Sequence, residues 1–183
     1  MALYLVRHGR PSIVPGTPAP AWQLDPKHED AVAELASRAP WSDDAVWFTS
    51  PEPKAARTAY LLAGREVDVV DDLREHDRGV GAWVDDFQNA MAEAFARPDS
   101  AVRDGWEALE ETRRRVVKAA RELLVASPGK DVVLVGHGTA WTLLAAELTG
   151  TEPDLERWRT LAMPDVITVH AQGLPRAADH PTL

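Results

Sequence analysis

Short apolar segments alternate with longer segments of helical periodicity along this chain of 183 residues. Short apolar runs bounded by turn residues are typical of buried strands, and their alternation with helices indicates a parallel sheet covered on both faces. We therefore expect an α/β fold, a three-layer α/β/α sandwich around a mostly parallel central sheet. The expected strands are residues 3–6, 45–49, 67–70, 131–135 and 166–170, and the expected helices are residues 25–38, 51–63, 87–96, 106–125 and 139–148.

Length and composition indicate a single domain over residues 1–183, since hydrophobic residues make up 45% and charged residues 27% of the sequence. The formal net charge of -9 argues against nucleic acid or an acidic membrane as a partner, because such binders are usually basic. No apolar run approaches the ~20 residues of a membrane span. There is no cysteine for thiolate chemistry. The first residues lack the basic region of a signal peptide, so we expect a cytoplasmic protein.

Three of the expected strands end in polar turns. Arg7 and His8 follow the first strand, Ser50 follows the second with Lys54 close behind it, and His137 follows the fourth. In open α/β sheets, ligands bind beyond the carboxyl ends of the strands. We therefore expect these side chains to converge on one site at that edge of the sheet.

His8 and His137 each stand between an apolar strand and a glycine. A glycine there, such as Gly138, lets the backbone turn sharply and present its amide groups to a ligand. Arg7 and Arg10 flank His8, and a guanidinium binds phosphate through two parallel hydrogen bonds. Their positive charge is expected to lower the pKa of His8 and keep its ring neutral and nucleophilic. These residues together indicate phosphate chemistry with a histidine nucleophile.

Four segments of the chain resemble the signature blocks of the histidine phosphatase superfamily, also called the phosphoglycerate-mutase-like family. A single Arg-His-Gly is a moderate signal, but four blocks in the expected order make a strong one. The resemblance implies the phosphoglycerate-mutase-like fold and favours the phosphatase branch. The four segments are Leu5-Val6-Arg7-His8-Gly9, Thr49-Ser50-Pro51 with Lys54-Ala55-Ala56-Arg57-Thr58-Ala59, Leu73-Arg74-Glu75, and Val133-Leu134-Val135-Gly136-His137-Gly138.

The resemblance implies a role for each matched residue. His8 would attack phosphorus and become phosphohistidine, while Arg7 would bind the phosphoryl oxygens. His137 would hydrogen-bond the same oxygens and stabilise transition-state charge. Glu75 would protonate the leaving oxygen and then activate water as a base. A phosphate dianion beside Glu75 is expected to raise the pKa of this carboxyl group.

The sequence departs from the family pattern at several positions. Lys54 stands where the family has an arginine, and a lysine cannot make the bidentate contact. Arg57, three residues further on, is expected to compensate in part as a phosphate ligand. Arg10 stands where an acidic residue is common, and substrate contact and surface charge are both open to it. Val80-Gly81-Ala82-Trp83 and Gly105-Trp106-Glu107 replace the usual Trp-Glu-Gly and Gly-Glu-Ser.

Some candidate residues also have a purely structural interpretation. Asp77 is a rival to Glu75 as the acid, and Ser50 is expected to be a helix N-cap rather than a nucleophile. The arginines at positions 113–115 are expected on a solvated helix face, because acidic residues precede them. The remaining histidines show no metal-ligand spacing such as His-Glu-x-x-His, so we expect no metal and no other cofactor.

The leading functional hypothesis is a metal-independent phosphatase that acts on a small phosphorylated metabolite. A phosphoglycerate-type mutase is the nearest alternative, but the resemblance implies a longer chain with covering segments for that activity. A phosphohistidine-protein phosphatase is a further alternative, although short proteins of that type generally lack the acid corresponding to Glu75. A phosphate-binding regulatory module with weak or no turnover is the alternative outside enzymes, and Lys54 is its main support. The sequence leaves the oligomeric state open.

Overall fold

The computed structural model describes residues 1–79 and 84–170. The altered segment at residues 80–83, with Trp83, and the C-terminal residues 171–183 lie outside the described part. Five strands form one sheet in the order β3-β2-β4-β1-β5. The first four strands run parallel, and β5 pairs antiparallel with β1. The strands are β1 (Ala2–Arg7), β2 (Val46–Thr49), β3 (Asp68–Val69), β4 (Val132–Gly136) and β5 (Asp165–His170).

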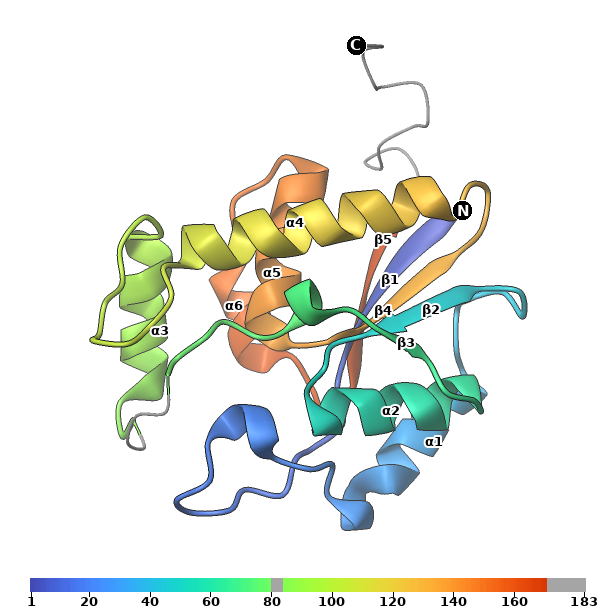
Figure 1. Cartoon of the computed structure of the whole chain (residues 1–183), viewed down its shortest axis with the longest axis horizontal. Helices are drawn as coiled ribbons and strands as arrows, with labels where there is room; N and C mark the ends of the chain where they lie inside the picture. Colours follow the sequence, from blue (N-terminus) through green and yellow to red (C-terminus); the bar gives the residue numbers. More distant parts are fainter. Residues whose placement is uncertain (80–83, 171–183) are drawn as a thin grey trace.

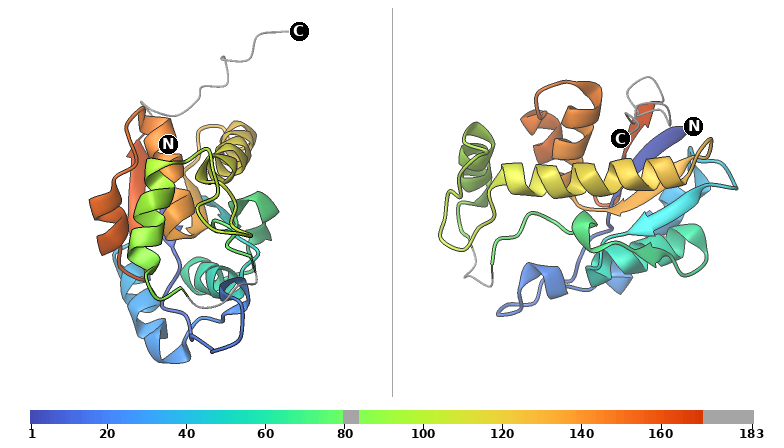
Figure 2. Two further views of the ribbon diagram at one scale, coloured as in Figure 1. Left: turned by 90° about the vertical axis from the view of Figure 1, so that its left-hand side faces the viewer. Right: turned by 45° about the horizontal axis from the view of Figure 1, so that its top comes forward.

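Helices cover both faces of this sheet. Helices α4 and α5 lie on one side and α1 and α2 on the other, while α3 lies at one end of the molecule (Figure 1, Figure 2). The mostly parallel α/β architecture expected from the sequence is therefore confirmed. The helices are α1 (Glu29–Ser37), α2 (Pro53–Ala63), α3 (Phe87–Ala96), α4 (Leu109–Ala126), α5 (Gly138–Thr149) and α6 (Leu155–Thr160), with short 3-10 turns η1 (Ala19–Ala21), η2 (Pro26–His28) and η3 (Asp71–Leu73).

The pleat of β1 divides the core into two clusters, because successive side chains of a strand point to opposite faces. Leu3 and Leu5 pack with buried residues of α4 and α5, such as Val116. Tyr4 and Val6 pack on the other face with residues of α1 and α2. Both faces of the central strands are apolar, as a parallel sheet covered on two sides requires.

Two local features differ from the sequence-based expectation. The region expected to form a single helix over residues 25–38 begins as the 3-10 turn η2, which Asp25 caps by accepting a hydrogen bond from the Lys27 amide at 3.0 Å. Helix α6 had no clear periodic signal, and it is held by tertiary packing. Its Trp158 is buried against α3, with its ring centroid 5.7 Å from that of Phe95.

Within the described part of the chain, none of the helices is both long enough and apolar enough to cross a lipid bilayer.

Candidate active site

The carboxyl ends of β1, β2 and β4 meet at one edge of the sheet. The amide of His8 donates a hydrogen bond to the Gly136 carbonyl at 2.8 Å, and the amide of Ser50 donates to the Val135 carbonyl at 2.9 Å. The sheet ladder therefore continues one residue beyond the strands and fixes the three turns relative to one another. This arrangement confirms that the strand ends bring His8, Ser50 and His137 together.

His8 is buried and holds a single tautomer. Its Nδ1 atom lies 2.7 Å from the Gly9 carbonyl oxygen, which can only accept a hydrogen bond. Nδ1 therefore carries the proton, and Nε2 keeps a lone pair. Burial, together with the charge of Lys54, lowers the pKa of His8 to about 3, so the ring is neutral at physiological pH. A neutral imidazole with a free Nε2 lone pair has the form needed for nucleophilic attack.

Gly9 is required by the close packing behind His8. A Cβ atom at position 9 would lie 2.7 Å from Cδ1 of Leu24 and 2.9 Å from Cγ2 of Val32. The Gly9 amide donates to the Thr58 hydroxyl of α2 at 3.0 Å. The turn after β1 is thus fixed between the loop before α1 and helix α2, which restricts the position of the His8 ring.

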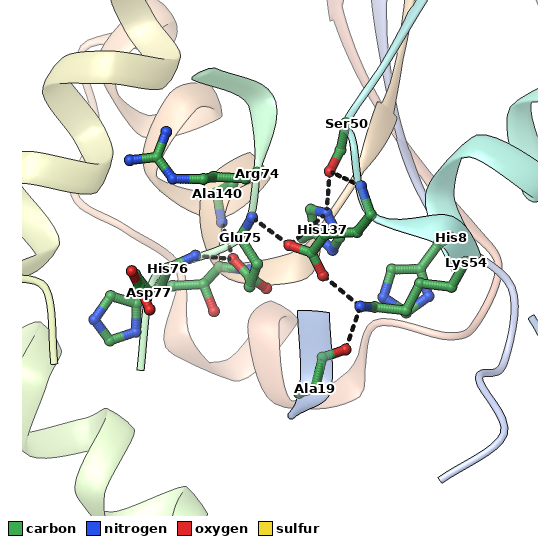
Figure 3. A network of polar contacts seen from close by, with 12 residues as sticks. His8, Ala19, Ser50, Lys54, Arg74, Glu75, His76, Asp77, His137 and Ala140 are labelled. Atoms are coloured by element: carbon green, nitrogen blue, oxygen red, sulfur yellow. Dashed lines mark hydrogen bonds and ion pairs between the residues drawn. The ribbon is translucent and has the colours of Figure 1, made fainter. Parts of the chain in front are cut away.

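His137 faces His8, with ring centroids 5.2 Å apart. Its Nε2 atom lies 2.7 Å from the Ser50 hydroxyl oxygen (Figure 3). The same nitrogen lies 3.2 Å from Oε1 of Glu52. Its buried Nδ1 atom has no hydrogen-bond partner among the residues that the structure describes. Burial and the neighbouring His8 and Lys54 lower the pKa of His137 well below its usual value. Ser50 therefore contacts the second histidine, whereas the N-cap position of α2, expected at Ser50, is occupied by Glu52.

Arg7 lies at the junction between β1 and α5. One guanidinium nitrogen donates to the Leu161 carbonyl, and the buried Nε has no partner within residues 1–79 and 84–170. A Cβ atom on Gly138 would lie 3.3 Å from this Nε. Gly138 is the first residue of α5, and an amide at this position has no partner within the helix and can bind an anion. Arg7 and Gly138 thus place donors side by side.

Lys54 is buried, with a side-chain exposure of 6%, and its ammonium lies inside the protein (Figure 3). It donates to the Ala19 carbonyl at 2.8 Å and forms a short ion pair with Glu52. The Glu52 side chain is equally buried, with an exposure of 7%. Burial raises the pKa of Glu52, and the charge of Lys54 opposes this shift. The sequence analysis did not single out Glu52, because nothing in Ser50-Pro51-Glu52-Pro53-Lys54 shows that the carboxylate turns inward.

Glu75 reaches the N-terminal end of α5. Its carboxylate accepts hydrogen bonds from the amides of Thr139 at 3.2 Å, Ala140 at 3.0 Å and His76 at 2.9 Å. Burial acts to raise its pKa, but the charge of Arg78 and these amides outweigh burial and hold the pKa below its ordinary value. The Glu75 carboxyl group is therefore ionised in this structure. The raised pKa expected from the sequence applies to the pocket with a phosphate dianion bound.

Asp77, the rival acid, lies at the exposed end of this loop. Its carboxylate accepts a hydrogen bond from the Gly79 amide at 2.8 Å. The geometry therefore brings Glu75 to the first turn of α5 and leaves Asp77 in the turn that follows.

Arg115 corrects the expectation that residues 113–115 form a solvated face. Arg114 is 72% exposed, but the Arg115 side chain is only 10% exposed. Arg115 pairs with both oxygens of Glu107 at 2.8 and 2.9 Å. Its remaining donors bind the carbonyls of Asp72, Arg74 and Glu75. Arg115 thus connects α4 to the loop that carries Glu75.

Two further candidates have exposed side chains. Arg57 lies on the outer side of α2, where its Nε donates to Glu29 at 2.9 Å and its side chain is 46% exposed. Arg10 is exposed, and its backbone carbonyl accepts a hydrogen bond from the Asp25 amide at 2.9 Å. The structure therefore brings together His8, Arg7, Lys54, Glu75, His137 and Gly138, and it does not bring Arg57 to them.

A sequence profile of the histidine phosphatase superfamily, branch 1, matches residues 3–173. The chain belongs to this superfamily. It is 28% identical over 173 residues to an uncharacterized phosphatase, PhoE, from Bacillus subtilis (strain 168), and the match covers 86% of this chain and 82% of PhoE. The resemblance drawn from the four sequence blocks is therefore confirmed.

Solved structures of other proteins share this superfamily member's fold. YhfR from Bacillus stearothermophilus is 22% identical, with a TM-score of 0.73 and coverage of 97% of this chain and 95% of that chain. A mutant of phosphoserine phosphatase from Entamoeba histolytica, solved in complex with phosphoserine, is 18% identical. Its TM-score is 0.69, and coverage is 96% of this chain and 93% of that chain. At these identities the similarity shows the fold alone.

No group of three or more histidine, aspartate or glutamate side chains is placed to hold a metal ion in the portion of the chain that the structure describes.

Proposed function

We propose that this protein is a phosphomonoesterase that hydrolyses a small phosphorylated metabolite through a phosphohistidine intermediate on His8. The observation that carries the proposal is the His8 ring, buried and neutral, with Nδ1 donating to the Gly9 carbonyl and Nε2 keeping its lone pair. Buried donors from Arg7, Lys54 and His137 surround it. Phosphoryl transfer depends mainly on such positioning and on charge stabilisation.

In the first step, Nε2 of His8 forms a bond to phosphorus as the bond from phosphorus to the leaving oxygen breaks. Arg7, Lys54, His137 and the Gly138 amide bind the phosphoryl oxygens and stabilise their charge. Glu75 gives a proton to the leaving oxygen. It must first gain that proton, which the incoming phosphate dianion favours by raising the carboxyl pKa.

In the second step, Glu75 takes a proton from water, and the water oxygen attacks phosphorus. The bond between nitrogen and phosphorus breaks, and its electron pair returns to Nε2 of His8. The products are an alcohol and inorganic phosphate. The Entamoeba relative was solved with phosphoserine, which supports a small phosphomonoester as the substrate class.

The decisive experiment traps the intermediate. Rapid quenching of a reaction with a labelled phosphomonoester is expected to yield an acid-labile, base-stable phosphoryl group that peptide mass spectrometry assigns to His8. His8→Ala should abolish both the adduct and the release of phosphate, whereas His28→Ala, at a surface histidine, should change neither. Wild-type turnover by a folded His8→Ala protein would show that the proposed mechanism is wrong.

A further inference from the structure

We propose that Glu52 is a specificity-determining residue that sets the net charge with which the phosphate pocket accepts an anion. The pocket takes up a tetrahedral dianion only together with one proton. This inference rests on the proposed function of the pocket as a phosphate site.

Glu52 contacts three parts of that pocket at once. Its Oε2 forms the short ion pair with Lys54, its Oε1 accepts the Glu75 amide at 2.9 Å, and the same oxygen lies 3.2 Å from Nε2 of His137. The carboxylate is therefore in direct contact with two of the proposed phosphate ligands, Lys54 and His137.

The contacts change the charge that an incoming anion meets. Lys54 occupies the position of the family arginine, and the carboxylate of Glu52 neutralises the charge of its ammonium group. Both side chains are buried, so water and salt screen the repulsion between Glu52 and an anion only weakly. Lys54 has a remaining hydrogen-bond donor for the anion, but its charge is shared with a carboxylate.

A proton removes this repulsion. The charged and titratable groups that face Glu52 are Lys54 from α2, His137 before α5 and Glu75 after η3. His8, after β1, faces the His137 ring. The extra proton can lie on Glu52, on the adjacent His137 or on the anion, and the net charge of the occupied pocket is the same in each case. Glu75 is a poorer acceptor, because three backbone amides already stabilise its ionised form.

The pKa values of Glu52 and Glu75 shift in opposite directions, and this supports Glu52 as the carboxyl group that takes up the proton on anion binding. Burial raises the pKa of Glu52 despite its ion pair with Lys54. For Glu75, burial also acts to raise the pKa, but Arg78 and the amides prevail and lower it. These directions favour Glu52 as the carboxyl group that first takes up the proton, and in turnover the same proton must then pass to Glu75 before Glu75 protonates the leaving oxygen.

The test uses sulfate, a tetrahedral anion that stays doubly charged between about pH 5 and about pH 9. Sulfate affinity of the wild-type protein, measured by calorimetry, should fall about tenfold for each pH unit above the pKa of the coupled group. Glu52→Gln removes the charge and keeps one acceptor oxygen, which can serve Lys54 or the Glu75 amide but not both in their present positions. It should bind sulfate about tenfold or more tightly than the wild type at about pH 8, with little pH dependence.

Three comparisons can overturn the inference. Glu34→Gln, at an exposed carboxylate paired with Arg38, should retain the wild-type pH dependence. If Glu52→Gln instead weakens sulfate binding by one factor at every pH, Glu52 only holds Lys54 in place. If Glu75→Gln removes the pH dependence while Glu52→Gln retains it, the proton belongs to Glu75.

A second measurement needs no variant and covers the case in which Glu52→Gln does not fold. Calorimetry of wild-type protein in two buffers of different ionisation enthalpy should show uptake of about one proton per sulfate bound at about pH 8. Binding without proton uptake would refute the role of Glu52 but leave the proposed function intact, because phosphohistidine could still form on His8. Absence of both sulfate binding and phosphohistidine would remove the proposed function as well.

Discussion

The ammonium group of Lys54 is buried and makes its hydrogen bonds to protein groups, whereas that of a surface lysine would bind water. Arg57, one helical turn further on, is half exposed and paired with Glu29. Loss of a buried transition-state donor commonly reduces the rate on the order of 10²-fold. Exposed ion pairs contribute little.

We therefore expect Lys54→Ala to lower kcat/KM for p-nitrophenyl phosphate by about 10²-fold and Arg57→Ala to change it by no more than about twofold. Steady-state kinetics of both variants provide the comparison. If Arg57→Ala lowers kcat/KM strongly while Lys54→Ala leaves it unchanged, Arg57 is the phosphate ligand, in contradiction to its surface position.

Glu75 provides a second prediction at the scale of single residues. A general acid matters most when the leaving group is poor. Glu75→Gln should therefore reduce kcat for an alkyl phosphate by about 10²-fold or more, but reduce kcat for p-nitrophenyl phosphate much less. Asp77→Asn is the matched control, since Asp77 caps the exposed turn. Equal losses on the two substrates, or a larger effect of Asp77→Asn, would assign the acid elsewhere.

At the scale of elements, one side chain of helix α4, Arg115, holds the loop that carries Glu75 in place. Arg115 pairs with Glu107 and binds three carbonyls of residues 72–75. Burial acts to raise the pKa of Glu107, but the hydrogen bonds from Arg115, the Asp77 amide and Thr112, together with the charge of Arg115, outweigh burial and lower this pKa to about 2. The pair is therefore charged throughout the physiological range, and it fixes the direction of the backbone that carries Glu75.

Replacement of Arg115 should misplace Glu75 rather than remove phosphate binding. Arg115→Met is expected to lower kcat for alkyl phosphates by about tenfold or more, with a smaller loss for p-nitrophenyl phosphate and little change in KM. The leaving-group dependence separates this positioning role from simple destabilisation. Arg114→Met, at a side chain that is 72% exposed, is the control. A uniform loss on both substrates, in parallel with a loss of folded protein, would count against the positioning role.

At the scale of the whole molecule, three histidines are buried in the form without charge. Burial is the main cause of the lowered pKa values of His8, His76 and His137, with His8 at about 3. In the unfolded chain a histidine titrates near 6.5. Between these values the unfolded state binds more protons, so the free energy of unfolding rises with pH. The stabilisation is complete above about pH 6.5 and is lost as the pH falls below it.

Urea denaturation should therefore show stability falling between about pH 6.5 and about pH 5, by up to about 1.4 kcal/mol per pH unit for each buried histidine. His76→Gln should reduce this slope by the contribution of one histidine, because His76 is buried but outside the proposed chemistry. His28→Gln, at a side chain that is 38% exposed, should retain the wild-type slope. A wild-type slope in His76→Gln would show that His76 does not contribute.

Local patterns in the sequence were enough to predict the sheet and the edge at which the site lies. Apolar runs set the central strands β1, β2 and β4 because their period and length are local properties. The residues just beyond those strands had to meet, since parallel strands present their carboxyl ends at one edge. His8, Arg7, His137 and Lys54 could be found in this way from adjacent residues in the chain, and the four sequence blocks added Glu75.

Which charged side chains face inward depends on how distant segments pack together, so it could not be predicted from the sequence. Arg114 and Arg115 are neighbours in one basic run, yet one is exposed and the other is buried against a loop some forty residues away in sequence. Glu52 turns into the pocket and Arg57 turns out of it. Local sequence does not distinguish these cases, because the energy of a buried charge depends on partners that packing brings from distant segments.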